Sequence, residues 1–323
     1  MNDRAGGEDR VVPAEHGVVA GRPEQGGGAA TPSFGLPADA ASGLPRGLGQ
    51  TRIGQRVFQW GRMTHVMGIV NVTPDSFSGD GLLADGGSAT EAAVALATAM
   101  ASDGADLIDV GGESSRPGHA VVGQDDEVAR VVPAIEAIRA ALPDLPISID
   151  TTKPGVAEAA LAAGANLVND VWGVADDDRL ARVAAAHRVP MIVMHNRSEA
   201  RYRMLLAEVI ADLERALERA LAAGCRWEDL LVDPGFGFGK TPEHNLELLR
   251  ELPALHVLGR PILLGTSRKS TLGKVLDLPA DQRLEATLAT TALAAAAGVD
   301  IVRVHDVQAN VRVARMTDAV VRR

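Results

Sequence analysis

Short apolar runs recur along the chain, each followed by a polar or glycine-rich loop and then by an alanine-rich stretch. Runs of this length, rich in Val, Ile and Leu, predict buried strands, and the stretches between them predict helices. The eight runs are HVMGIVN ending at Asn71, DLIDV at Val110, PISID at Asp150, NLVND at Asp170, PMIVMH at His195, DLLVD at Asp233, PILLG at Gly265 and DIVRVH at His305.

The helical period is clearest in residues 204–223. Several predicted helices end in glycine before the next run, at Gly164, Gly224 and Gly298, as expected for a residue in the left-handed conformation after a last helical turn. The inward face of residues 204–223 is predicted to comprise Leu206, Val209, Ile210, Leu213, Leu217 and Leu221.

Eight strands alternating with helices over about 260 residues match a closed (β/α)₈ barrel. A doubly wound open sheet is the alternative, but such a sheet gathers its ligand at one switch point, whereas polar residues here follow nearly every run. We predict a single (β/α)₈ TIM barrel over residues 51–323. A short hairpin is expected within residues 51–63, after a disordered tail over residues 1–50 that has few large apolar residues.

Composition restricts the possible partners. The formal charge of -10 argues against a nucleic-acid surface, which would be basic, so any anion must be held by a local cluster. No stretch of eighteen apolar residues predicts a membrane span. Cys225 is the only cysteine, and the opening residues MNDRAGGEDR contain no apolar signal region, so we expect a cytoplasmic protein.

Polar residues close three of the apolar runs, at Asp150, Asn169 and Asp233. A carboxylate accepts two parallel hydrogen bonds from an N–C–N edge, and an amide both donates and accepts, so together they predict a site for a flat heterocycle. The alternative for any single Asp is that it caps the following helix. Asp170 fits that alternative better.

The loop DPGFGFGKTPEHN, which begins at Asp233, nearly matches a phosphate-binding P-loop. The first glycine of that motif would fall at Pro234, which has no backbone N–H to donate, so we reject the match. The glycines are instead expected to turn the chain over the barrel mouth, leaving Asp233 and Phe238 facing the ligand.

Basic residues gather near the end of the barrel, as Arg268 and Lys269 in GTSRKS and as Arg303 and His305 in IVRVH. Loops after the seventh and eighth barrel strands often bind phosphate. Arg268 and Lys269 could instead be solvated surface charges, but Arg303 must point into the barrel mouth or be paired. A histidine within an apolar strand, such as His195, is more often a satisfied core residue than a metal ligand.

Two long polar loops, NVTPDSFSGDG from Asn71 and GGESSRPG from Gly111, have the composition of mobile lids. No Cys and His spacing predicts a zinc site. A hard ion such as Mg²⁺, held mainly by substrate phosphate and one protein oxygen, remains an open alternative.

Six motifs spread over residues 67–307 together resemble the dihydropteroate synthase family: MGIVNVTPDSFSGDG, IDVGGESSRPG, SIDTTKPGVAEAALAAGANLVND, DPGFGFGKTPEHN, GTSRKS and VRVHDV. The resemblance implies a TIM-barrel transferase of folate biosynthesis, a sulfonamide target. Such an enzyme joins (7,8-dihydropterin-6-yl)methyl diphosphate to 4-aminobenzoate and releases diphosphate. It also implies Mg²⁺ and a homodimer.

The resemblance also implies roles for individual residues, with Asn71 as the metal ligand. Two departures from the family pattern stand in the loops: the acid of SFSGDG comes one place late, at Asp80, and Ser115 replaces a common Thr. The implied catalytic residues are Asp75, Phe77, Asp80, Arg116 and Lys269. The implied binding residues are Asp150, Asn169, Met194, Asp233, Gly265 and Lys269 for the pterin, Asn71, Ser115, Arg303 and His305 for the diphosphate, and Ser115, Arg116, Pro117, Phe238 and Ser270 for 4-aminobenzoate.

No Ser, Cys or Lys is expected beside a base as a nucleophile. The hypothesis is therefore that the C–O bond ionises to a pterin-stabilised cation, which the amine attacks while the lids exclude water. Two alternatives remain. One is a methyltransferase that moves a methyl group from methyltetrahydrofolate to a corrinoid protein, and the other is a catalytically silent pterin-binding paralogue.

Overall fold

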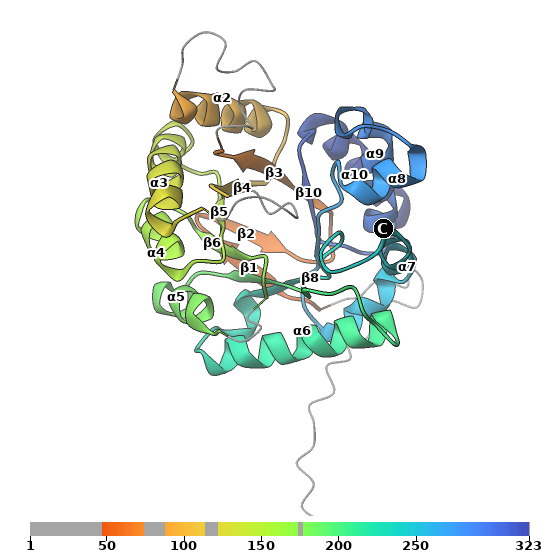
Figure 1. Ribbon diagram of the computed structural model, residues 1–323. Helices are drawn as coiled ribbons and strands as arrows, with labels where there is room; N and C mark the ends of the chain where they lie inside the picture. Colours follow the sequence, from red (N-terminus) through yellow and green to blue (C-terminus); the bar gives the residue numbers. More distant parts are fainter. Residues whose placement is uncertain (1–46, 74–87, 114–121, 174–176, 323) are drawn as a thin grey trace, which may run out of the picture. The chain divides into compact units, whose positions relative to one another are not determined.

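The computed structural model describes residues 47–73, 88–113, 122–173 and 177–322, all of which belong to one compact unit of the chain. Eight parallel strands form one sheet in the order β8-β7-β6-β5-β4-β3-β10-β9. A parallel bridge between Val232 and Ile262 joins its two edges. The predicted (β/α)₈ barrel is therefore confirmed (Figure 1).

The barrel strands lie within the eight predicted runs or end within one residue of them. They are β3 (His65–Asn71), β4 (Leu107–Gly111), β5 (Ile147–Asp150), β6 (Leu167–Asp170), β7 (Met191–Met194), β8 (Leu230–Asp233), β9 (Leu263–Leu264) and β10 (Ile301–Val304).

Helices surround the strands (Figure 1). They are α2 (Ala89–Ser102), α3 (Gln124–Ala141), α4 (Pro154–Ala162), α5 (Arg179–His187), α6 (Leu205–Ala222), α7 (Pro242–Arg250), α8 (Ser270–Leu276), α9 (Leu284–Ala296) and α10 (Val307–Val321). Three short 3₁₀ helices, Trp227–Asp229, Leu252–Leu258 and Ala280–Gln282, lie in the connections. Among the described residues, none of the helices combines the length and the apolarity that a membrane crossing requires.

The predicted helix of residues 204–223 is α6. Val209, Leu213 and Leu217 are buried as expected. Leu206, Ile210 and Leu221 are only partly buried against the core, because Ala216 and Ala220 occupy the centre of the buried face. The glycines after α4, α6 and α9 have φ of 115°, 104° and 84°, which confirms them as helix stops.

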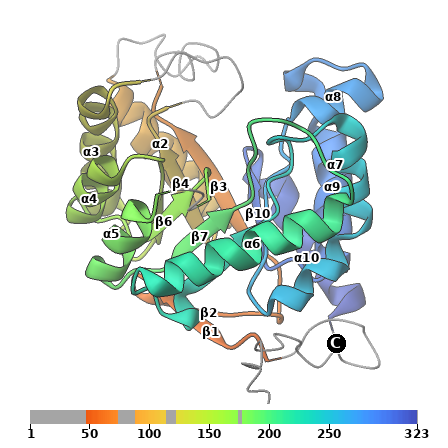
Figure 2. The same ribbon diagram turned by 60° about the horizontal axis from the view of Figure 1, so that its bottom comes forward.

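The predicted N-terminal hairpin is formed by β1 (Gln50–Ile53) and β2 (Arg56–Gln59), paired antiparallel. It begins one residue before the predicted boundary, and most of the predicted tail lies outside the described residues. Ile53, Phe58 and Trp60 pack in one cluster with side chains from seven barrel strands. The hairpin thereby closes the end of the barrel from which the strands start (Figure 2), so a ligand must enter from the opposite end.

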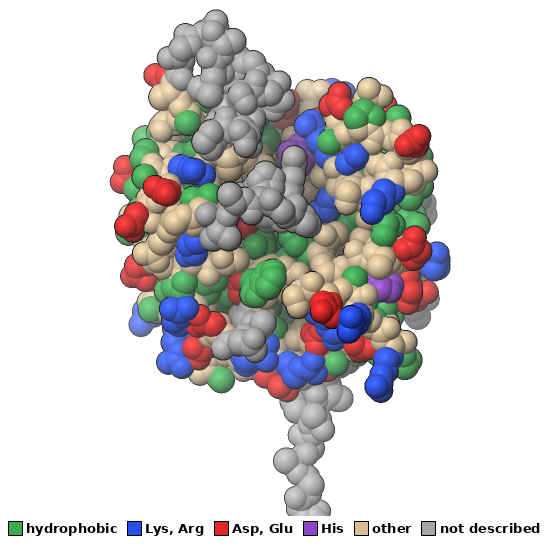
Figure 3. Space-filling view, viewed as in Figure 1, with side chains coloured by type: hydrophobic (Ala, Val, Ile, Leu, Met, Phe, Trp, Pro, Cys, Tyr) green, Lys and Arg blue, Asp and Glu red, His purple; other side chains and the backbone are tan. Residues whose placement is uncertain are grey.

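Charged side chains are mixed on the molecular surface. On the face drawn in Figure 3, acidic and basic groups are interspersed around the rim of the barrel. The net charge of -10 is therefore not gathered into a single patch on this face.

Candidate active site

A network of buried polar side chains lies inside the barrel at the carboxyl ends of the strands. Arg303 on β10 reaches across to two carboxylates: its Nε donates to Asp109 Oδ2 at 2.6 Å, and its Nη2 donates to Asp150 Oδ2 at 2.7 Å. Asn169 Nδ2 donates to the same Asp109 oxygen at 2.9 Å. The parallel register places Asp150 and Asn169 side by side, because the two residues pair between β5 and β6.

Asp109 was missing from the predicted site, although it is fully buried and joins two predicted residues. The sequence held a signal for it. A charged residue within the apolar run DLIDV must face the barrel interior or be paired, which is the argument that singled out Arg303. Asp109 Oδ1 and Ser148 Oγ, at paired register positions, have no hydrogen-bond partner among the described residues.

Arg303 combines the two alternatives that the sequence left open for it. It points into the barrel and it is paired with carboxylates. Nε and Nη2 of Arg303 already donate to the two carboxylates. Only its remaining N–H groups could bind the diphosphate, as the resemblance implies. A guanidinium has five N–H groups in a planar fork, so it can bridge two carboxylates in this way, which an ammonium cannot do with the same geometry.

Lys269 and Asp233 form the second charged group of the site. Lys269 Nζ donates to the Phe236 carbonyl and lies 4.3 Å from the centroid of the Phe238 ring. Burial lowers the pKa of Lys269 to about 8, and the negative charge of Asp233 opposes this shift. Burial also raises the pKa of Asp233, opposed first by Lys269. Asp233 Oδ1 accepts the Gly235 N–H at 2.7 Å, which leaves Oδ2 for a ligand.

Gly237 lets the loop after β8 approach Lys269. Its φ is 84°, and a Cβ at this position would lie 2.8 Å from Lys269 Cδ. The glycines therefore turn the chain over the barrel mouth, as the sequence predicted.

A cavity of about 290 Å³ opens beside this network. It brings together predicted residues of all three ligand sites. Asp150 is joined to it by Arg303, Asn169 by way of Asp109 and Arg303, and Asp233 by Lys269. The predicted residues that line it are Asn71, Phe238, Gly265, Lys269, Ser270, Arg303 and His305.

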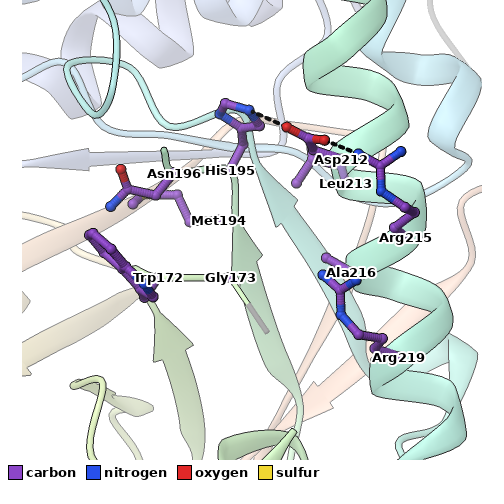
Figure 4. A pocket seen from close by; sticks show the side chains of 10 residues that line it. All are labelled: Trp172, Gly173, Met194, His195, Asn196, Asp212, Leu213, Arg215, Ala216 and Arg219. Carbon is purple, nitrogen blue, oxygen red and sulfur yellow. Dashed lines mark hydrogen bonds and ion pairs between the residues drawn. The ribbon is translucent and has the colours of Figure 1, made fainter. Parts of the chain in front are cut away.

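Met194 lines a different cavity, of about 280 Å³, between β7 and α6. Figure 4 shows this cavity with Trp172 and Arg219 on opposite sides. Met194 is buried and pairs in register with Asp233, so it supports the strand end that carries a predicted pterin residue.

Ser267 and His305 form a pair that the sequence analysis did not expect. Ser267 Oγ and His305 Nδ1 are 2.9 Å apart in the wall of the main cavity. Ser267 Oγ also accepts the backbone N–H of His305 at 3.2 Å. A serine does therefore stand beside a potential base, and a covalent route through Ser267 has to be tested.

Several other polar residues have local partners. Arg268 pairs with Asp306 through Nε at 3.2 Å and Nη2 at 2.7 Å. Asp170 Oδ1 accepts the backbone N–H groups of Trp172 and Gly173, so it caps the turn after β6. His195 is a satisfied core residue, because both ring nitrogens have partners and burial lowers its pKa to about 3.

Six predicted site residues lie in the two loops that fall outside the described residues. They are Asp75, Phe77, Asp80, Ser115, Arg116 and Pro117.

Asp150→Asn should change how stability depends on pH. Burial raises the pKa of Asp150 to about 7 although Arg303 opposes the shift, so the folded protein keeps a proton between about pH 4 and 7 that the unfolded chain loses. Wild-type stability should therefore fall as pH rises through this window, by at most about 1.4 kcal/mol per pH unit. Asn cannot titrate, so urea unfolding should show the variant gaining on the wild type as pH rises. A constant difference would contradict the raised pKa.

Comparison with known proteins identifies the family. Residues 67–305 match the family described as pterin binding enzyme. The dihydropteroate synthase of Clostridium beijerinckii is 48% identical over 273 residues, which cover 84% of this chain and 100% of the relative.

Solved structures agree with this sequence match. A dihydropteroate synthase from Clostridium difficile, solved in the presence of pteroic acid, is 48% identical with a TM-score of 0.78, over 82% of this chain and 100% of that one. The Xanthomonas albilineans enzyme with 4-aminobenzoic acid is 42% identical with a TM-score of 0.78, over 84% and 97%. The chain therefore belongs to the pterin binding enzyme family, within its dihydropteroate synthases.

Proposed function

We propose that this chain is a dihydropteroate synthase that condenses (7,8-dihydropterin-6-yl)methyl diphosphate with 4-aminobenzoate to 7,8-dihydropteroate and diphosphate. The observation that carries the proposal is the cluster of Asp150, Asn169 and Arg303 at the strand ends beside a cavity lined by Phe238 and Lys269. The chain's similarity to dihydropteroate synthases along nearly their whole length supports it.

The buried oxygens suit the pterin ring. Asp150 and Asp233 can accept hydrogen bonds from the amino-pyrimidine edge, and the Asn169 carbonyl can accept another while its Nδ2 donates to Asp109. Lys269 lies between Asp233 and Phe238, so its ammonium adjoins both the pterin and the aminobenzoate sides. Because Asp150, Asn169 and Asp233 are buried, an unmatched hydrogen bond to any of them is costly, and the site discriminates strongly between heterocycles.

The reaction needs no enzyme nucleophile. The C–O bond of the substrate breaks, and its electron pair leaves on the diphosphate. The aminobenzoate nitrogen then forms a bond to the exposed methylene carbon and loses a proton. His305 and Arg303 at the cavity wall are positioned to stabilise the charge on the leaving group. Ser267 orients His305 in this scheme.

A direct assay tests the function. Purified protein with both substrates and Mg²⁺ should form dihydropteroate and diphosphate in equal amounts, and the mass of the quenched protein should not increase. Pterin binding without turnover would indicate the silent paralogue. A pterin adduct on Ser267 would replace the ionisation route with a covalent one.

We also propose Mg²⁺ at Asn71. Among the described residues, no three His, Cys, Asp or Glu come together as a metal site, so the protein offers the amide oxygen of Asn71, and the substrate phosphates would supply further ligands. The charges support this. Of the four cationic residues lining the cavity, three have carboxylate neighbours: Arg268 has Asp306, Lys269 has Asp233, and Arg303 has Asp109 and Asp150. The fourth, Arg283, donates to two backbone carbonyls.

Removal of the metal should abolish turnover. A bound Mg²⁺ would neutralise charge on the diphosphate, and three of the cavity's four cations already have carboxylate neighbours. EDTA should reduce the rate by at least about 100-fold, by analogy with the loss of one charge-stabilising group, and added Mg²⁺ should restore it. Undiminished turnover in EDTA would contradict the proposed site.

We further propose a cytoplasmic homodimer. Cys225 is the only cysteine, is buried and has no partner for an intramolecular disulfide, which suits a reducing compartment. Leu293, Met316 and Val320 on α9 and α10 are more than half exposed, which suits an interface with a second copy. Light scattering of the purified chain would measure the oligomeric state.

A further inference from the structure

Lys240 anchors the loop between β8 and α7 through contacts of its side-chain nitrogen. Its Nζ donates to three atoms: His195 Nδ1 at 2.8 Å, the Gly235 carbonyl at 3.0 Å and the Phe238 carbonyl at 3.2 Å. An ammonium has three N–H groups, so the three acceptors satisfy all of them. The side chain that a P-loop would aim at a phosphate is here turned toward the end of β7.

Asp212, the second partner of His195, fixes the tautomer of the imidazole. Its Nε2 lies 3.1 Å from Asp212 Oδ2 on α6, so Nε2 carries the hydrogen and Nδ1 accepts from Lys240. The imidazole side chain is fully buried. Arg197 and Arg215 hold Asp212 in turn (Figure 4 shows Asp212 with His195 and Arg215). Lys240 is therefore positioned by a chain of side chains that runs through β7 to α6.

The loop backbone depends on this support. Gly235 has φ of 69°, and a Cβ there would lie 1.8 Å from the His195 carbonyl, so the loop packs directly on the end of β7. The Phe238 N–H donates to the Gly235 carbonyl at 3.1 Å. Lys240 binds the carbonyls of both residues, at either end of this turn. The turn is thus closed once by the backbone and again by the ammonium.

We propose that Lys240, oriented by His195 and Asp212, is a positioning residue that sets the aminobenzoate side of the active site by fixing Phe238. Lys240 lies under the turn, whereas Phe238 lines the cavity and packs on Lys269. On the pterin side, Asp150 and Asn169 are held by strand pairing and do not depend on this turn, whereas Asp233 and Lys269 each contact it through one hydrogen bond, to the Gly235 N–H and the Phe236 carbonyl. Loss of Lys240 should therefore raise KM for 4-aminobenzoate more than KM for the pterin diphosphate. The inference rests on the proposed function for its kinetic part only.

Lys240→Met tests the inference, with Lys274→Met on the exposed part of α8 as the control. We expect the variant to raise KM for 4-aminobenzoate by about tenfold or more, since small displacements of a positioning group have effects of this size. KM for the pterin diphosphate should rise clearly less, because Asp150 and Asn169 do not touch the turn. A purely structural role would lower the thermal midpoint and the active fraction, and leave both KM values unchanged.

Two substitutions of His195 separate its contacts. Asn places an oxygen near the position of Nδ1, so His195→Asn keeps the acceptor for Lys240. Gln places its amide near Nε2, so His195→Gln keeps the donor to Asp212 but not the acceptor. We expect His195→Gln to raise KM for 4-aminobenzoate and His195→Asn to raise it much less. The reverse order would overturn the role given to Lys240.

Hydrogen exchange of residues 234–241 supplies a measurement that needs no turnover. Lys240→Met should speed exchange in this segment, which contains the protected N–H groups of Gly237 and Phe238, and the control should not. If the wild type makes no dihydropteroate but the segment is still loosened, the proposed function fails and the anchoring role stands. Unchanged exchange together with unchanged KM values in an active enzyme would refute the anchoring role.

Discussion

Replacement of Arg303 by Met is expected to lower the free energy of unfolding by about 3–5 kcal/mol. The side chain bonds Asp109 at 2.6 Å and Asp150 at 2.7 Å, and both carboxylates are at least nine-tenths buried. Without the guanidinium they face each other in a site that water enters poorly. Asp150 already has a pKa raised to about 7, so it can take up a proton, which should keep the loss near the lower end of this range. Urea unfolding measures it.

The controls for Arg303 separate charge from bulk. Arg312 is exposed on α10, so Arg312→Met should change stability by less than about 0.5 kcal/mol. Arg303→Lys should stay well below wild-type stability, because one ammonium cannot reach both carboxylates in the geometry of the fork. Adding Asp109→Asn to Arg303→Met should recover part of the loss by removing an unpaired charge. Wild-type stability of the single Met variant would mean that the carboxylates are not ionised.

The barrel could be predicted because its signals are local. Each strand is a short apolar run, and the glycines at 164, 224 and 298 mark helix ends within the residues that they terminate. The cap formed by Asp170 is equally local, since its partners are two and three residues away. Strand count and the polar strand ends then favour a closed barrel over an open sheet.

The partners of charged residues were harder to predict because they come from distant parts of the chain. Arg303 meets carboxylates 194 and 153 residues earlier in the sequence. The sequence showed that the charge of Arg303 needed a partner if it was buried. Which carboxylates supply it depends on which side chains meet inside the barrel. Asp109 was overlooked for the same reason, although its place in DLIDV marked it as an interior charge. The pairing of Ser267 with His305, 38 residues apart, likewise depends on the adjacency of β9 and β10.

The loop DPGFGFGK could be excluded as a P-loop from the sequence, but the role of its lysine could not be predicted. Pro234 excluded a P-loop from the sequence alone. That Lys240 would instead bind His195 requires β7 and β8 to be neighbours, which only the sheet order establishes. Local residue chemistry thus restricts what a loop can bind, and strand adjacency decides what it does bind.

Asp233→Asn should reduce kcat/KM for the pterin diphosphate by about 100- to 1000-fold while leaving stability unchanged or slightly higher. The carboxylate would accept hydrogen bonds from N–H groups of the pterin, whereas the Asn side chain presents an N–H group of its own to them. The N–H groups of the pterin are then buried without an acceptor. Folding should tolerate the change because Asn can still accept the Gly235 N–H and because burial opposes the charged form of Asp233. Steady-state kinetics and urea unfolding measure the two effects.

Lys269 provides a second readout of the same substitution. The negative charge of Asp233 raises the pKa of Lys269 and partly offsets the lowering by burial. Without that charge, the pKa of Lys269 should fall further below about 8, so the ammonium is lost at lower pH and any alkaline limb of the rate profile that it causes should shift in that direction. Asp277→Asn, an exposed change of the same charge, should shift nothing. A large loss of stability with unaltered kcat/KM would make Asp233 a structural residue, because a carboxylate kept for binding costs the fold more than it contributes.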